Sequence, residues 1–159
     1  MLRIEPFQRA DLPLAATFIA AIQEHERVNV PELKPGREIA DDYVKAMVRR
    51  LRENDGLMLM ARQGADTVGF VAGWVEMDQD PCLREEARRY ALVSDIYVVD
   101  AARRQGIAHR LLGAFEQAMR ERGCRRLRLC AKATNPSAIA CYEAAGYRPY
   151  ELILSKPVG

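Results

Sequence analysis

The stretch that decides the fold is DIYVVDAARRQGIA, residues 95–108. It starts as an apolar run typical of a central strand and, after a short polar turn, enters a helix whose first turn contains Gly106. The first N–H groups of a helix have no partners within it and lie at the positive end of the helix dipole. Gly106 lets a bulky group approach the backbone, and Arg103 and Arg104 add positive charge. The segment therefore predicts a site for an anion such as a phosphate.

Two better-known phosphate-binding loops do not fit this segment. The P-loop requires Gly-Lys followed by Ser or Thr, and no lysine or hydroxyl stands at the junction. The dinucleotide fingerprint requires three glycines, and only Gly106 is present. On these features alone, an ordinary basic helix start without a ligand explains the segment equally well.

Outward from the junction, the spacing of apolar residues changes period several times. Alternating and apolar runs predict strands over residues 2–6, 57–62, 67–77, 89–99, 125–132 and 150–156. Helical spacing predicts helices over residues 11–22, 38–53, 106–122 and 135–145, with a long loop at residues 25–37 between the first two. We therefore expect an α/β fold of the α+β type in the order β-α-α-β-β-β-α-β-α-β.

Length and composition predict one globular domain over residues 1–159. The chain has a mass of 17.9 kDa, 49% hydrophobic and 29% charged residues. Its net charge of +2 is small for a nucleic-acid binder. No apolar run is long enough to span a membrane and the N-terminus does not resemble a signal peptide, so a cytoplasmic protein without membrane contact is expected.

Metal binding is not expected. The two histidines are far apart in sequence, and no two cysteines have the C-x-x-C spacing of a zinc site. The four cysteines are expected to be reduced thiols.

The charge is unevenly distributed along the chain. Residues 1–99 carry 13 basic and 17 acidic side chains, whereas residues 100–159 carry 11 basic and 5 acidic ones. This asymmetry favours an anionic ligand in the second half and a cationic one in the first, although a solvated surface also explains it.

Two motifs resemble those of a known family. Residues 103–108 resemble the Gln/Arg-x-x-Gly-x-Gly/Ala acyl-CoA signature of the GNAT superfamily of N-acetyltransferases. The segment NPSAIACYEAAGY, residues 135–147, is similar to the second motif of that family. The order of elements is similar over the whole chain, whereas residues 1–80 match only in pattern. The resemblance implies a mixed, mostly antiparallel central sheet of six to seven strands with about four helices.

The resemblance implies that acetyl-CoA is the acyl donor. In the family the pyrophosphate rests on backbone amides of the first motif, a role carried here by Arg103, Arg104, Gln105, Gly106, Ile107 and Ala108. The pantetheine arm pairs with the fourth strand, which is implied to place it beside Tyr97 and Val98. Asn135 would contact the cofactor arm, and an N-cap role explains it equally well. Relatives often have a bulge that separates two strands here, for which this sequence carries no signal.

The candidate catalytic residues are Tyr142, which the resemblance implies, and Asp95, an acid in an otherwise apolar strand. Tyr142 matches the tyrosine that protonates the departing thiolate in many relatives, and a phenol of pKa about 10 suits that role. The attacking group must be a neutral amine, so a base must accept a proton from the ammonium form, and Asp95 is the first candidate. Many relatives carry a glutamate at the position of Ser94, so proton transfer through a water molecule is the alternative to a direct carboxylate base. A structural role is the second interpretation of Asp95.

Four further polar or aromatic residues are candidates for a role at the site. Glu76 and Asp78 are further candidates for the base. His25 is either a solvated loop residue or part of the wall around the acceptor. Trp74 belongs either to the core or to a pocket mouth.

We therefore expect an enzyme that transfers acetyl from acetyl-CoA to a primary amine by direct attack in a ternary complex. The acceptor would be a small molecule or a protein N-terminus, and the acidic first half favours a cationic amine. The resemblance also allows a homodimer. A CoA-binding regulatory module without turnover is the alternative, and a basic nucleic-acid adaptor is disfavoured by the small net charge.

Overall fold

The computed structural model describes residues 1–158, and its centre is one five-stranded sheet in the order β1-β2-β3-β4-β5. The strands are β1 (Leu2–Pro6), β2 (Leu57–Gln63), β3 (Asp66–Met77), β4 (Arg89–Val98) and β5 (Leu127–Leu129). β1 to β4 pair antiparallel in sequence order, and β5 joins β4 in parallel. The expected mixed, mostly antiparallel sheet is therefore confirmed.

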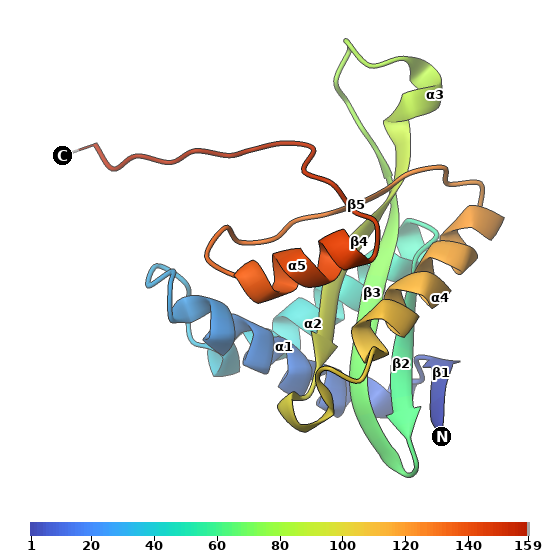
Figure 1. The fold of residues 1–159 in the computed structure, drawn as a ribbon, viewed down its shortest axis with the longest axis vertical. Coiled ribbons are helices and arrows are strands. Elements are labelled where there is room, and N and C mark those ends of the chain that lie inside the picture. Colours follow the sequence, from blue (N-terminus) through green and yellow to red (C-terminus); the bar gives the residue numbers. More distant parts are fainter. Residues whose placement is uncertain (159) are drawn as a thin grey trace.

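Helices cover both faces of the sheet (Figure 1). The α-helices are α1 (Leu12–Arg27), α2 (Gly36–Glu53), α3 (Glu85–Arg88), α4 (Ile107–Glu121) and α5 (Pro136–Ala144), with 3-10 turns η1 (Arg9–Asp11) and η2 (Asp100–Ala102). α1 and α2 pack on one face, and α4 packs on the other together with residues of α5. α3 is a single turn within the connector expected between β3 and β4.

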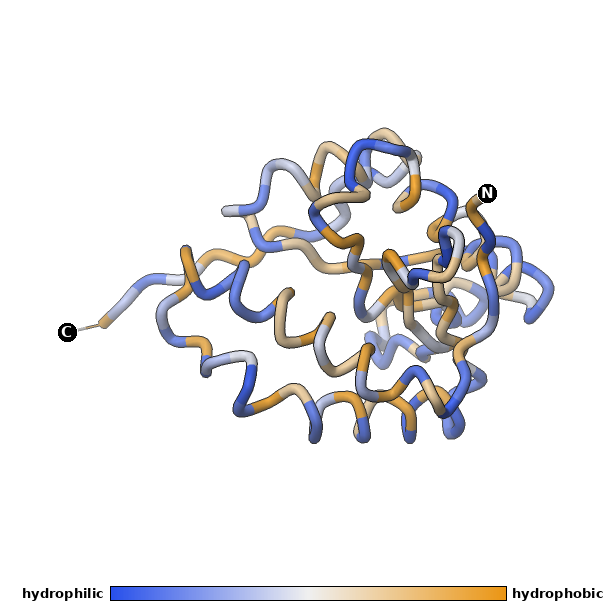
Figure 2. The backbone as a smooth tube through the Cα atoms, turned by 90° about the horizontal axis from the view of Figure 1, so that it is seen from below, coloured by the Kyte–Doolittle hydropathy of each residue, from blue (hydrophilic) through white to orange (hydrophobic). Residues whose placement is uncertain are grey.

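The alternation of side chains along the central strands produces one core on each face. Phe70 on β3 is fully buried with Phe18 of α1, whose ring centroid lies 5.9 Å away, whereas Val71 packs with Phe115 of α4 on the opposite face. Figure 2 shows hydrophobic and hydrophilic residues alternating along the helices, as expected for helices that each bury one face against the sheet. Full burial of each such side chain contributes about 1.5–3 kcal/mol.

The loop expected at residues 25–37 is shorter than predicted, because α1 continues to Arg27 and α2 begins at Gly36. Glu24 stabilises this arrangement. One carboxylate oxygen accepts the N–H of Gly36 at 2.6 Å, and the other pairs with Arg27 at 2.6 Å. A side chain on Gly36 would meet the Ala20 backbone, so the two helices approach each other closely at this glycine.

The prediction of a strand over residues 150–156 is wrong, and the sheet has five strands rather than six or seven. The Tyr150 hydroxyl accepts a hydrogen bond from Arg128 of β5 at 3.1 Å, and beyond it the chain leaves the sheet (Figure 1). Leu152, Ile153 and Leu154 are 76–84% exposed. Alternation predicts a strand only where a sheet edge accepts it, and β5 forms only three residue pairs, fewer than the expected run over 125–132.

Gly73 on β3 provides a test of how tightly β3 and β4 pack. A Cβ atom there would lie 2.0 Å from the Leu92 carbonyl oxygen and 2.6 Å from Phe115. We expect Gly73→Ala to lower the free energy of unfolding by about 3 kcal/mol, the upper part of the range for overpacking. Thermal or urea unfolding measures this change.

Gly113→Ala is the matched control for that substitution. Gly113 lies on the exposed side of α4, where a Cβ would meet nothing within 4 Å. We expect this variant to gain about 0.5–1 kcal/mol, because alanine favours the helix. Equal unfolding curves for the two variants would contradict the close approach at Gly73.

Candidate active site

A one-residue bulge in β4 determines the shape of the sheet where the expected site residues meet. Residues 72 and 73 of β3 pair with Asp95 and Val93, so Ser94 has no partner of its own on β3. A bulge bends the strand and increases its local twist. The structure thus has a bulge at Ser94, for which the sequence carried no signal.

The bulge turns Asp95 toward α2. Val93 is buried in the core beneath α4, and strict alternation would send Asp95 to the same side. The extra residue reverses the alternation, so Val98 enters that core and Asp95 faces the opposite side. There the Asp95 carboxylate accepts hydrogen bonds from the Ser94 hydroxyl at 2.5 Å and from the Tyr43 hydroxyl of α2 at 3.1 Å.

β4 and β5 separate at the bulge. Their last paired residues are Val93 and Leu129, and the rest of β4 pairs only with β3 within the described chain. The N–H of Val99 donates to the Val68 carbonyl at 2.9 Å, on the β3 side. Because backbone groups alternate in direction along a strand, the N–H of Val98 faces the open side. An extended ligand can pair with such an edge like an added strand.

The charge of Asp95 acts on Tyr142. Burial raises the pKa of Asp95, and the hydrogen bonds from Ser94 and Tyr43 oppose this change. Burial also raises the pKa of Tyr142 to about 12, and the charges of Glu26 and Asp95 are among the further causes. Tyr142 therefore remains protonated at neutral pH and has a proton to donate.

Glu26 and Tyr43 belong to this cluster, although the sequence did not indicate either. Glu26 lies in the last turn of α1, and its charge raises the pKa of both Asp95 and Tyr142. The sequence placed Glu26 in a loop, where nothing distinguished it from other surface acids. Tyr43 was expected on the apolar face of its helix, and burial with the charge of Asp95 raises its pKa to about 12.

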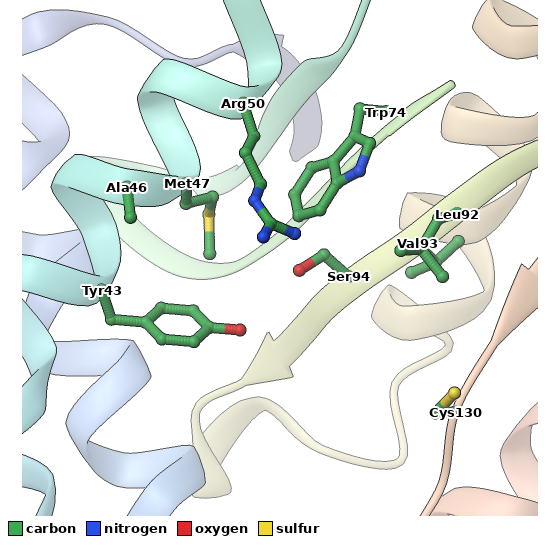
Figure 3. Close-up of a pocket in the computed structure, with 9 residues that line it drawn as sticks. All are labelled: Tyr43, Ala46, Met47, Arg50, Trp74, Leu92, Val93, Ser94 and Cys130. Carbon is green, nitrogen blue, oxygen red and sulfur yellow. The ribbon is translucent and has the colours of Figure 1, made fainter. Parts of the chain in front are cut away.

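A pocket of about 440 Å³ opens between α2 and the part of β4 around the bulge (Figure 3). α2 contributes one face of its helix, at spacings of three and four residues, while β3 and β4 form the floor. The lining residues are Tyr43, Ala46, Met47, Arg50, Trp74, Leu92, Val93, Ser94 and Cys130. Trp74 is 4% exposed, so it belongs both to the core and to the pocket wall.

The turn between β4 and α4 exposes several free backbone N–H groups. Arg104 and Gly106 have positive φ angles of 63° and 75°. Within the described chain, no backbone or side-chain oxygen accepts a hydrogen bond from the N–H of Arg104, Gln105 or Gly106. A Cβ on Gly106 would meet nothing within 4 Å, so the space in front of these groups is open. The turn can therefore hold a phosphate group.

The two arginines of this turn differ in their contacts. Arg103 donates to the Val98 carbonyl at 3.1 Å, pairs with Asp100 at 2.8 Å and lies over the Tyr97 ring at 5.8 Å. Arg104 forms no ion pair within residues 1–158. Arg103 therefore stabilises the turn, while Arg104 keeps its charge available to a ligand.

The remaining expected cofactor residues have structural roles in this structure. The side chain of Asn135 accepts the N–H of Ala138 at 3.1 Å and caps α5, as its alternative interpretation stated. Ile107 is 3% exposed and anchors α4 in the core, and Ala108 packs against the same core. The Tyr97 ring packs on Phe18 at 5.2 Å. Contacts between these residues and a cofactor stay a prediction.

The other candidates for a base lie apart from Asp95. Glu76 accepts the Trp74 indole N–H at 2.6 Å, and Asp78 pairs with Arg128 at 2.5 Å. Glu76 is four residues along β3 from the partner of Asp95, about 13 Å at 3.3 Å per residue. His25 is exposed on α1.

Residues 1–158 lack two further features. They contain no group of three or more His, Cys, Asp or Glu side chains that could hold a metal ion. No helix in this range has the length and apolar character needed to cross a membrane.

Comparison with known proteins identifies the family. The model of the acetyltransferase (GNAT) family matches residues 19–147, so the chain belongs to this family. The uncharacterized N-acetyltransferase YycN of Bacillus subtilis is 30% identical over 86 residues, which cover 54% of this chain and 53% of YycN. YhfO of the same organism, also named an uncharacterized N-acetyltransferase, is 27% identical over 108 residues, 68% of this chain and 67% of YhfO. The match thus spans only about half the length of YycN.

A solved structure supports the fold over nearly the whole chain. The aminoglycoside N-acetyltransferase AAC(6')-Iy, solved in complex with CoA, superimposes with a TM-score of 0.73 at 14% identity. The superposition covers 99% of this chain and 95% of that one. At this identity the similarity shows the fold alone.

The raised pKa of Asp95 predicts a pH-dependent effect of Asp95→Asn on stability. A half-buried carboxyl whose pKa is raised by folding costs stability as the pH rises from about 4, the ordinary aspartate pKa, through its raised value. We expect Asp95→Asn to raise Tm at pH 7 and to leave it unchanged where both proteins are uncharged at this position, near pH 3. Thermal unfolding across this range measures the difference.

Asp42→Asn controls for the change in net charge, since the Asp42 side chain is 90% exposed on α2. We expect the Tm difference between this variant and the unmodified protein to stay nearly constant from pH 3 to pH 7. A Tm for Asp95→Asn below that of the unmodified protein at pH 7 would contradict burial as the dominant influence on Asp95.

Proposed function

We propose that this protein is an N-acetyltransferase that transfers acetyl from acetyl-CoA to a primary amine by direct attack in a ternary complex. The acceptor is a small molecule or a protein N-terminus. The observation that carries the proposal is the combination of an open β4 edge, a turn with free N–H groups at its end, and the Asp95 and Tyr142 pair beside the gap.

The proposed acetyl-CoA site follows the course of the chain from β4 into α4. The pyrophosphate lies on the backbone of residues 103–108, where open space and unpaired N–H groups support it. The pantetheine arm pairs with β4 at Tyr97 and Val98, and Asn135 contacts it from α5. The CoA complex of AAC(6')-Iy, a protein of the same fold, adds support.

The chemistry requires a neutral amine, a polarised thioester and a proton for the departing sulfur. The N–H of Val98 on the open edge polarises the thioester carbonyl. Asp95, or a water molecule held by it, accepts the amine proton, and its raised pKa suits a base better than an ordinary aspartate. Tyr142 protonates the thiolate. Positioning of the two substrates supplies most of the rate.

A CoA-binding module without turnover is the alternative, and family membership does not favour it. Incubation with acetyl-CoA and a panel of primary amines, with detection of free thiol, separates the two. Amine-dependent thiol release supports the enzyme. Acetyl-CoA binding without thiol release for any amine would support the module and refute our proposal.

Five further expectations accompany this function as proposals. One acetyltransferase domain spans residues 1–159, the protein acts without a metal in the cytoplasm, it does not bind nucleic acid, and it forms a homodimer. Light scattering measures the last of these, and a single monomer mass at high concentration would contradict it.

Tyr142→Phe tests the proposed general acid. We expect kcat to fall about 100-fold with little change in KM for acetyl-CoA, because only the proton donor is removed. Tyr147→Phe is the matched control, since its ring centroid lies 6.2 Å from that of Tyr142 and burial raises its pKa to about 12 as well. Equal losses of kcat in the two variants would contradict a specific role for the Tyr142 proton, because loss of either buried hydroxyl would then have the same effect.

Gly106→Glu tests the proposed pyrophosphate site. We expect loss of acetyl-CoA binding in calorimetry, because a carboxylate would project into the space proposed for a phosphate. Gly64→Glu is the control, with a similar positive φ of 64°, open surroundings and the same added charge in the β2–β3 turn. Retained binding in Gly106→Glu would remove this assignment.

A further inference from the structure

The pocket between α2 and β4 contains one charged side chain, and that side chain is a cation. Arg50 lies in the last turn of α2, and the other eight lining residues are uncharged at neutral pH. The guanidinium points into the pocket between Trp74 and Ser94 (Figure 3). Its carbon atom lies 5.5 Å from the centroid of the Trp74 ring.

No carboxylate neutralises Arg50. Within residues 1–158 it takes part in no ion pair. Asp95, beside the pocket lining, accepts hydrogen bonds from Ser94 and Tyr43. Two other acids, Glu76 and Asp78, are engaged elsewhere. Glu76 accepts the outward-facing indole N–H of Trp74, and Asp78 pairs with Arg128. The pocket therefore has a positive end, contrary to the cationic acceptor that the acidic first half of the sequence favoured.

The positive end and the reacting end lie apart along α2. Tyr43, which is hydrogen-bonded to Asp95, precedes Arg50 by seven residues on the same helix. Seven residues correspond to about 10 Å between the backbone positions of Tyr43 and Arg50, at 1.5 Å per residue, and the guanidinium itself extends toward Ser94 (Figure 3). Between Tyr43 and Arg50 the pocket wall formed by α2 is apolar, with Met47 buried in it.

We propose that Arg50 determines acceptor specificity by binding a carboxylate at the far end of the acceptor from its amine. The acceptor is then an amine with an apolar or aromatic body of several bonds and an anionic end. This inference rests on the proposed acetyl transfer. One guanidinium matches one carboxylate through two parallel hydrogen bonds, whereas a polyamine would meet an unneutralised positive charge.

The test uses four amines with acetyl-CoA and thiol detection. 4-(Aminomethyl)benzoate carries the amine and carboxylate at the proposed separation, and 4-methylbenzylamine is its neutral counterpart. Glycine carries the two groups too close together, and spermidine is a polycation. We expect kcat/KM for the benzoate to exceed that for each of the other three by about 10- to 100-fold, the range for a hydrogen bond to a charged group.

Variants at two neighbouring positions isolate the guanidinium. We expect Arg50→Gln to reduce the ratio of kcat/KM between 4-(aminomethyl)benzoate and 4-methylbenzylamine to about one, mainly through KM for the benzoate. Arg50→Glu is expected to reverse the preference. The variant should then have a higher kcat/KM for 1,4-bis(aminomethyl)benzene, which carries a second amine in place of the carboxylate, than for the benzoate. Arg49→Gln removes an exposed arginine that does not line the pocket and is expected to keep the original ratio.

Calorimetry of 4-(aminomethyl)benzoate with the CoA-loaded protein gives a measurement independent of turnover. Binding that is lost in Arg50→Gln and retained in Arg49→Gln supports the inference even without catalysis. If both benzylamines are acetylated equally well, the role of Arg50 is overturned while the proposed enzyme stands. If no amine is acetylated and the benzoate binds equally to both variants, the inference and the enzyme both fail.

Discussion

The single extra residue at Ser94 is the constraint on which the centre of this structure depends. Without it, Asp95 would point into the core beneath α4, where an ionised carboxylate is costly. With it, the carboxylate meets the hydroxyl groups of Ser94 and Tyr43, and β4 turns away from β5. One backbone irregularity thus creates both the polar cluster and the exposed strand edge, and Gly73 on β3 leaves the room for it.

Much of the framework could be predicted from the sequence, because it depends on local spacing. Periodicity indicated β1 to β4 and the main helices, and Gly106 marked the turn with unpaired N–H groups. The bulge could not be predicted, since Ser94 reads as an ordinary strand residue and its effect arises from pairing with β3. The roles of Glu26 and Arg50 also depend on contacts between elements that are distant in sequence.

α2 serves two purposes with one face. Met47 is 2% exposed in the core and also lines the pocket, so the packing that holds the helix on the sheet also holds the pocket wall. Tyr43 and Arg50 lie toward the two ends of that face and differ in chemistry, a phenol bonded to Asp95 and an unpaired guanidinium. A rigid helix therefore sets the distance between two polar groups, which a loop would not do.

The chain beyond Tyr150 has a consequence for the behaviour of the protein in solution. Leu152, Ile153 and Leu154 together leave several kcal/mol of apolar transfer free energy unrealised, at about 1.5–3 kcal/mol for each side chain. Salts that strengthen hydrophobic association increase the drive to cover them. These three aliphatic residues are therefore expected to lower the solubility of the protein in concentrated sulfate.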